Sequence, residues 1–118
     1  MYSKKVLQHF TDPKFFGKIK NPDVIGKAGN PRCGDLLTLY LKIEKGKIKD
    51  IKFETYGCAS AIASSDMICK LSINKTLKQA VDISFKDVAK ELGGLPPLKI
   101  HCAQLVTEAL RNAIKKHK

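Results

Sequence analysis

The sequence contains no tryptophan, and its aromatic residues amount to only 7% of the chain. So few rings leave little to stack against unpaired bases, which argues against a protein built to bind single-stranded nucleic acid. The chain also lacks any run approaching the ~20 apolar residues of a membrane-spanning helix. Its opening, MYSKKVLQHF, has no apolar segment of the secretory kind, so we expect a cytoplasmic protein without a membrane partner.

Acidic residues are scarce as well. Eleven aspartates and glutamates face 22 lysines and arginines, which leaves a formal net charge of +11. Such a balance suggests an acidic partner, either a nucleic acid or an acidic protein surface. Because the basic residues are spread along the chain and aromatics are few, we do not expect that partner to be nucleic acid.

What the chain does contain is enough apolar sequence for one core. Hydrophobic residues make up 43% of its 118 residues, so residues 1–118 are expected to fold as a single domain. Four cysteines are present. In a reducing compartment they are not expected to form disulfides, and are instead core thiols, catalytic thiols or metal ligands.

Alternating apolar and polar residues predict a β-hairpin in the middle of the chain. Residues 37–43 and 51–54 both follow period two, as half-buried strands do. Residues 13–32 are expected to form an irregular arm, with a short strand within residues 23–30. Residues 2–10 can form a short helix that ends at Asp12-Pro13.

Two loops could join the hairpin strands, and burial distinguishes them. A two-residue turn at Lys45-Gly46 would set apolar residues of one strand opposite polar residues of the other. A three-residue loop from Glu44 to Gly46 keeps the faces separate, so we predict this loop with Gly46 in the left-handed conformation. The expected cross-strand pairs are Leu37 with Phe53 and Leu39 with Ile51.

Helical patterns occupy the rest of the chain. Residues 59–72 form one helix, 76–83 a short one, and Ser84 is the N-cap of a third that stops at Gly93-Gly94. A last helix runs from about Leu98 to Lys116. Strands followed by helices predict an α+β domain with helices packed on a small antiparallel sheet. The stripe expected on the helix at 59–72 comprises Ile62, Asp66, Cys69 and Ile73, and that of the last helix comprises Cys102, Val106, Ala109, Leu110, Ala113 and Ile114.

Two cysteines flank the predicted hairpin, although no CxxC pair is present. Cys33 precedes the first strand and Cys58 follows the second, so both belong to the open end of the hairpin. In the expected register Cys33 lies opposite Gly57. Strict alternation would place the two thiols on opposite faces, but Gly34 and Gly57 permit the ladder to break there. We therefore expect the two sulfurs to converge.

A third cysteine and two further ligand types complete the candidate site. Cys58 opens one predicted helix and Cys102 lies in the first turn of another, where the helix dipole favours the thiolate. Asp35 adds a carboxylate two residues after Cys33, and His101 adds an imidazole. Three thiolates with one exchangeable N or O ligand could complete a tetrahedral zinc site or hold an iron–sulfur cluster, and both alternatives stay open. Cys69, on a helical stripe, is expected in the core.

Three motifs resemble a known family of iron–sulfur cluster assembly scaffolds, IscU and the N-terminal domain of NifU. They are CGD at 33–35, YGCASAIASSD at 56–66 and LPPLKIHC at 95–102, and the similarity extends over essentially the whole chain. The resemblance implies an α+β fold with a three-stranded antiparallel sheet. It implies a non-enzymatic scaffold that assembles a transient [2Fe–2S] cluster from iron and persulfide sulfur and transfers it to acceptor apoproteins.

The family resemblance also assigns roles and partners. The ligands would be Cys33, Cys58 and Cys102 with Asp35 or His101 as the variable fourth, and Cys102 would accept persulfide from a cysteine desulfurase. An iron donor, a ferredoxin and a chaperone ATPase with its J-domain cochaperone are implied partners, and a homodimer is left open. The chaperone segment would comprise Leu95, Pro96, Pro97, Leu98 and Lys99.

The chain departs from the family pattern at few places. Asp66 stands where the family usually has serine, and would add negative charge if it faced the site.

Zinc fits the same ligands, so the alternative function is a zinc-bound sulfur acceptor of the SufU type. The short segment between Cys58 and Cys102 and the presence of His101 argue against that branch.

Overall fold

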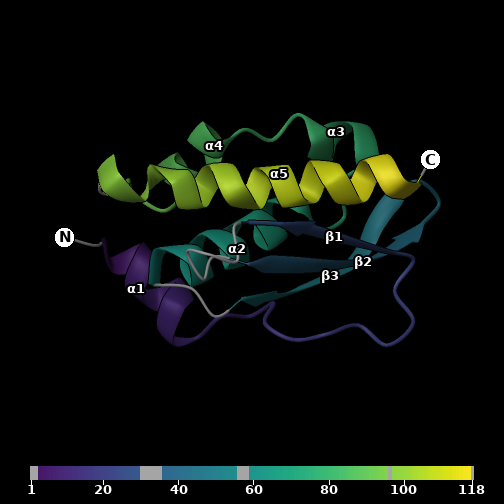
Figure 1. Ribbon diagram of the computed structural model, residues 1–118, viewed down its shortest axis with the longest axis horizontal. Helices are drawn as coiled ribbons and strands as arrows, with labels where there is room; N and C mark the ends of the chain where they lie inside the picture. The colour runs from purple at the N-terminus through teal and green to yellow at the C-terminus, as the bar shows by residue number, and fades with distance from the viewer. Residues whose placement is uncertain (1–2, 30–35, 56–58, 96, 118) are drawn as a thin grey trace.

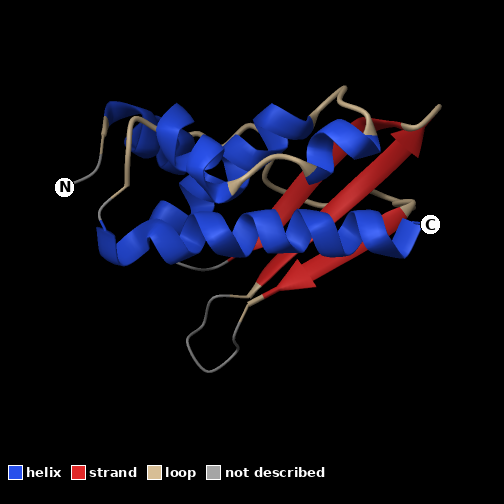
Figure 2. Ribbon diagram, turned by 90° about the horizontal axis from the view of Figure 1, so that it is seen from above, coloured by secondary structure: helices blue, strands red, loops and turns tan. Residues whose placement is uncertain are grey.

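A computed structural model describes residues 3–29, 36–55, 59–95 and 97–117 of the chain. Three antiparallel strands form one sheet in the order β1-β2-β3. One face of every strand is buried, and the helices α5 and α2 pack on the sheet, α5 on β1 and β2 and α2 on β3 (Figures 1 and 2). The predicted α+β class with helices on a small antiparallel sheet is therefore confirmed. The elements are α1 Lys4–Thr11, β1 Val24–Ala28, β2 Leu37–Glu44, β3 Lys47–Thr55, α2 Ala59–Ser72, α3 Leu77–Val81, α4 Phe85–Glu91, a 3₁₀ turn Pro97–Lys99 and α5 Ile100–His117.

The hairpin between β2 and β3 corrects the expected loop. Its turn has two residues, Lys45 and Gly46, with φ of 55° and 75°, and Glu44 pairs with Lys47. The three-residue loop is therefore wrong, although Gly46 does adopt the left-handed conformation. Primed turns of this kind match the twist of the strands they join.

A β-bulge explains why the faces nevertheless stay separate. Between Lys42 and Ile43 the register shifts, because Lys42 pairs with Asp50 while Ile43 pairs with Ile48. One extra residue on β3, Lys49, absorbs the offset that a two-residue turn would otherwise cause. The predicted pairs of Leu37 with Phe53 and Leu39 with Ile51 are wrong by two residues. The observed apolar pairs are Leu39 with Phe53 and Leu41 with Ile51.

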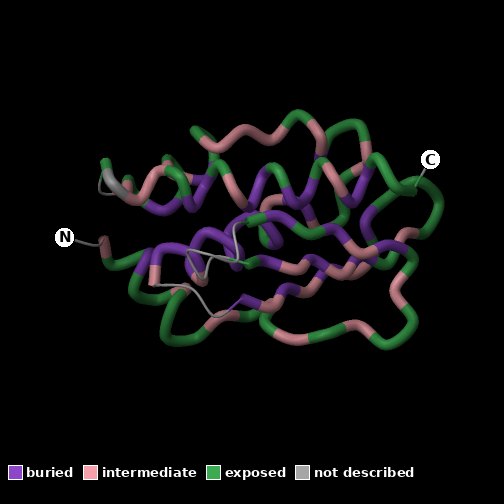
Figure 3. The backbone as a smooth tube through the Cα atoms, viewed as in Figure 1, coloured by how far each residue is buried: buried purple, intermediate pink, exposed green. Residues whose placement is uncertain are grey.

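The helix α2 occupies the centre of the molecule and is buried on nearly every side, as Figure 3 shows along its length. The expected stripe is only half right, since Asp66 and Cys69 are buried while Ile62 and Ile73 are half-buried. Burial is not confined to a stripe because α1 packs against α2 from one direction and the sheet and α5 from others. Small alanine and serine side chains let these neighbours approach.

The predicted helix ends are confirmed in the C-terminal half. Thr76 and Ser84 each form a reciprocal capping box with the residue three positions later. Gly93 and Gly94 follow α4 with φ of 79° and 99°. The last helix begins at Ile100 after a 3₁₀ turn, and the whole expected apolar face of this helix is buried.

None of the helices in the described ranges combines the length and apolar character needed to cross a bilayer.

The crossing of β1 and α5 depends on a glycine. A Cβ added at Gly26 would lie 2.5 Å from the Cβ of Ala113 and 2.8 Å from its backbone nitrogen, and closer still to the carbonyl oxygen of Ala109. Only a residue without a side chain fits this gap. Gly26 therefore lets the longest helix lie directly on the edge of the sheet.

Both outer strands of the sheet have part of their edges covered. On β1, the Asn112 side chain donates to the Lys27 carbonyl at 3.1 Å and the Lys116 ammonium to the Ile25 carbonyl at 3.3 Å. On β3, the Phe53 amide donates to the Phe15 carbonyl at 2.9 Å, and the Ile48 amide to the Lys75 carbonyl at 2.9 Å. Backbone groups that would face solvent thus find partners within the chain.

Candidate functional site

The end of the sheet at the start of β2 and the end of β3 adjoins two of the predicted ligand segments. Leu37 pairs with Thr55 there, and the Thr55 hydroxyl donates to the Leu36 carbonyl at 3.0 Å. Cys33, Asp35 and Cys58 lie outside the described residues, as does the pairing expected for Cys33 and Gly57. Their predicted convergence stays a prediction, but the described residues that follow 30–35 and precede 56–58 in the sequence do lie together.

The other two predicted ligands are described, and they are neighbours in space as well as in sequence. Cys102 lies in the first turn of α5 and is 1% exposed, while His101 is exposed. The Nε2 atom of His101 lies 3.7 Å from the Sγ atom of Cys102. The imidazole and the thiol are thus in contact at the start of α5. Cys102 also belongs to the apolar face of its helix, as the sequence predicted.

The segment before α5 presents a turn at the surface. Pro97 is exposed, and Leu95 and Lys99 are half-buried, with Leu95 packed against the core. Leu98 continues the 3₁₀ turn, and Pro96 lies outside the described residues. The exposed proline leaves the predicted chaperone segment accessible at its centre.

Cys69 is a core residue, as expected. It is fully buried in α2, and burial raises the pKa of its thiol well above the usual range, with the nearby Asp66 carboxylate adding to the shift. A thiol in this state is a poor nucleophile and a poor metal ligand. Across the described ranges, no three histidine, cysteine or acidic side chains are grouped so that they could hold a metal ion.

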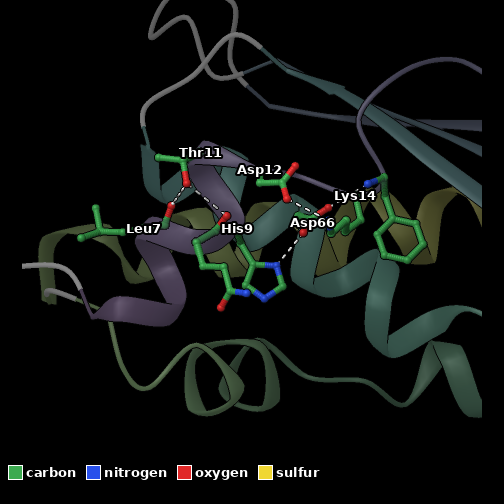
Figure 4. Close-up of polar contacts among 8 residues, drawn as sticks. Leu7, His9, Thr11, Asp12, Lys14 and Asp66 are labelled. Atoms are coloured by element: carbon green, nitrogen blue, oxygen red, sulfur yellow. Dashed lines mark hydrogen bonds and ion pairs between the residues drawn. The ribbon is translucent and has the colours of Figure 1, made fainter.

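A contact that sequence reasoning missed joins α1 to α2. His9 Nδ1 lies 2.5 Å from Oδ2 of Asp66, and the Phe15 amide donates to Oδ1 at 2.9 Å (Figure 4). The Asp66 side chain is 0% exposed and that of His9 is 13% exposed. The Asp66 carboxylate thus faces the N-terminal segment, and both of its oxygens are engaged there. An acid within a buried helix needs a donor, which is the only signal that could have suggested the contact.

A cavity of about 440 Å³ opens beside this pair, between α1, the arm and α2. Lys14 at its rim pairs with Asp12 at 2.8 Å, and that hydrogen bond raises the pKa of the lysine. Cationic and anionic groups are nearly balanced around the cavity, so it shows no clear preference for a charged ligand. Its lining comprises Lys5, Gln8, His9, Asp12, Lys14, Phe15, Asp66, Met67, Lys70, Leu71 and Glu91.

Comparison with known proteins gives a consistent result. The family model for the NifU-like N terminal domain matches residues 1–118. The iron-sulfur cluster assembly scaffold protein IscU 1 of Archaeoglobus fulgidus is 50% identical over 114 residues, which is 97% of this chain and 74% of that protein. The IscU scaffold protein of Escherichia coli is 42% identical over 121 residues, covering 99% of this chain and 94% of that protein.

A solved structure agrees with these sequence relatives. The iron-sulfur cluster assembly scaffold protein for the SUF system from Fervidobacterium islandicum, FiSufU, superposes with a TM-score of 0.80 at 29% identity, over 96% of both chains. The fold is therefore shared over nearly the full length of the domain.

Proposed function

Since the chain belongs to the family of NifU-like N-terminal domains, we propose that it is a scaffold on which iron–sulfur clusters are assembled and from which they are passed on. The observation that carries this proposal is the 50% identity to a scaffold protein over 97% of the chain. The proposed product is a [2Fe–2S] cluster, which is the cargo of the protein. The role is that of a carrier, with no turnover of its own.

The proposed ligands are Cys33, Cys58 and Cys102, with Asp35 or His101 in the fourth position. Thiolates are the usual ligands of such clusters. A carboxylate or imidazole in the fourth position binds a sulfide-bridged iron less firmly than a thiolate does, which suits a cluster that must leave. The adjacency of His101 and Cys102, at 3.7 Å, supports their membership of one site.

Cys102 is the proposed acceptor of sulfur. Its thiolate would attack the outer sulfur of a persulfide on a cysteine desulfurase, and the desulfurase cysteine would leave as a thiolate. The sulfur received is a sulfane sulfur, so its release as sulfide takes two electrons, which we assign to a ferredoxin. His101 would favour the thiolate that begins this exchange. Iron from an iron donor and the sulfide then form the cluster, and acceptor apoproteins receive it.

The turn before α5 is the proposed site for a chaperone ATPase and its J-domain cochaperone. Its residues are Leu95, Pro96, Pro97, Leu98 and Lys99. The exposure of Pro97 supports access from solvent.

A second function is favoured by the match to FiSufU, a scaffold of the SUF system. In this alternative the same ligands hold zinc, and the protein accepts persulfide without building a cluster. The 42% and 50% identities to proteins named IscU favour assembly over this role.

Anaerobic incubation with ferrous iron, cysteine and a cysteine desulfurase separates the two functions. Assembly gives absorption in the visible and equal amounts of bound iron and acid-labile sulfide. A zinc-bound acceptor stays colourless and gains one sulfur atom by mass spectrometry, and this result would replace the first proposal by the second.

Cysteine variants test the ligand assignment in the same assay. Cys33→Ser, Cys58→Ser and Cys102→Ser should each lose the visible absorption. The matched control is Cys69→Ala, which removes the core thiol and should keep the cluster. A loss of the cluster in this control equal to that in the three ligand variants would contradict the assignment.

A further inference from the structure

One end of the molecule, away from His101 and Cys102, gathers exposed lysines from three parts of the chain. The turn of the β2–β3 hairpin brings Lys45 and Lys47. The Leu77 amide donates to the Gly46 carbonyl at 3.1 Å, so the start of α3 is tied to this turn. A bridge between Lys47 and Thr76 holds the same two segments together. Lysines 75 and 78, on either side of that contact, therefore lie beside the hairpin turn.

The last turn of α5 reaches the same end. The Lys116 ammonium donates to the Ile25 carbonyl at 3.3 Å, and Ile25 pairs with Tyr40 in the middle of β2. Figures 1 and 2 both show the C-terminus, α3 and the hairpin turn at one end of the fold. We name this surface the lysine end. Its members, all exposed, are Lys45, Lys47, Lys75, Lys78, Lys115 and Lys116.

These cations are not neutralised by neighbouring acids. Within the part of the chain that the structure describes, none of the six takes part in an ion pair. Of the nearby acids, Asp23 is held by Lys42 at 3.8 Å, and Glu44 is exposed next to the turn. The lysine end is thus a concentrated positive field on a protein whose net charge is already +11.

The chemistry of this surface selects one class of partner. The exposed large apolar residues of the described chain belong to α1, the arm and the start of β2, so the lysine end offers none to insert into a membrane. Lysines are point charges without the planar fork that reads bases. Arg111, a few residues before the end of α5, does have a planar fork, but its guanidinium already donates to the carbonyls of Val81 and Ile83.

We propose that the lysine end is a docking surface for the acidic face of a partner protein. Exposed lysines bind through long-range attraction and stay hydrated, so the complex is rapid in forming, weak and sensitive to salt. This inference goes beyond the proposed scaffold function, and it does not require that any cluster be formed.

The lysine end lies at the opposite end of α5 from Cys102. Cys102 lies in the first turn of α5 and Lys115 in the last, and 13 residues at 1.5 Å each separate them by about 20 Å. This is more than twice the ~8 Å over which charges interact at physiological salt. An acidic partner at the lysine end would therefore leave the charge environment of Cys102 nearly unchanged.

A short fluorescent polyglutamate tests the proposal by anisotropy, at low and at ~0.15 M ionic strength. The test variant replaces Lys45, Lys47, Lys75 and Lys78 by glutamine. The matched control variant replaces the same number of exposed lysines outside the lysine end. These are Lys4, Lys18, Lys86 and Lys90.

We expect the test variant to bind polyglutamate at least about tenfold more weakly than the wild type, and the control to stay within about twofold. Equal losses in both variants would show that only net charge matters and would overturn the proposal. Binding of duplex DNA without measurable binding of polyglutamate would overturn it as well, in favour of a nucleic-acid surface.

A measurement on the unmodified chain keeps the test independent of folding in the variants. Amide chemical shifts of the wild type, followed during titration with polyglutamate, should change at the hairpin turn, the start of α3 and the last turn of α5. Changes confined to α1 or to the turn at Pro97 would contradict the proposed surface.

Discussion

Replacing Asp66 by alanine should destabilise the fold strongly, because the buried carboxylate joins α2 both to His9 in α1 and to the backbone at Phe15. The Asp66 carboxylate is 0% exposed and accepts from both His9 and the Phe15 amide. A hydrogen bond to a charged group contributes about 1.5–3 kcal/mol, and removing one partner of a buried pair costs about 3–5 kcal/mol. His9 retains 13% exposure and can be partly rehydrated, so we place the loss at the lower end, about 3 kcal/mol.

Urea and thermal unfolding monitored by circular dichroism measure this loss. For 118 residues, the average unfolding entropy corresponds to about 4 °C in Tm per kcal/mol, so Asp66→Ala should melt about 12 °C lower. Asp66→Asn is the matched control, because its amide oxygen can still accept from the Phe15 amide. It should lose clearly less than the alanine variant.

A double-mutant cycle then isolates the pair itself. His9→Ala, Asp66→Ala and the double variant should give a coupling energy of about 2 kcal/mol, the strength of one charge-assisted hydrogen bond. A coupling below about 0.5 kcal/mol would refute the reasoning. It would mean that α1 is held on α2 by apolar packing alone.

Four further predictions concern single sites. Gly26→Ala should cost about 1–3 kcal/mol, because the added methyl group collides with α5, and an unchanged Tm would contradict the close approach. Cys69 should resist thiol-alkylating reagents at about pH 8, where burial keeps its thiol protonated, and should react once urea unfolds the chain, as mass spectrometry of tryptic peptides would reveal. Asp35→Ala should slow the transfer of a cluster to an apoprotein, followed by visible circular dichroism, and transfer at the wild-type rate would argue against a carboxylate that eases release. Lys99→Glu should weaken chaperone binding measured by calorimetry and leave assembly intact, whereas equal affinity would exclude Lys99 from that contact.

The helices could be predicted from sequence because their signals are local. Thr76 and Ser84 cap helices with partners three residues away, and Gly93-Gly94 ends one by its backbone freedom. The alternation that predicts the strands is equally local. Such patterns need no knowledge of the tertiary structure.

The length of the hairpin turn could not be predicted, because it depends on a bulge elsewhere in the strand pair. In a regular ladder, a two-residue turn at Lys45-Gly46 would mix the buried and exposed faces, and we excluded it for that reason. The extra residue Lys49 makes that turn compatible with the faces, and nothing in a run of alternating lysines and isoleucines marks it as a bulge. A rule that is correct for a regular ladder therefore gave the wrong register.

Local and long-range contacts differ in the same way around the candidate site and in α2. The adjacency of His101 and Cys102 follows from their places in the sequence, and the structure brings their side chains to 3.7 Å. The partnership of His9 with Asp66 spans 57 residues, and no periodicity connects them. Only the packing of α1 on α2 decides which donor meets that buried acid.

The covered borders of the sheet have a consequence for how copies of this chain behave when crowded. Where Asn112, Lys116, Phe15 and Lys75 occupy the outward backbone groups, a neighbouring chain finds no open ladder to extend. Templated growth into fibrils begins at such open ladders. At these covered positions contact between copies would involve side chains, and exposed lysines of like charge would repel one another there.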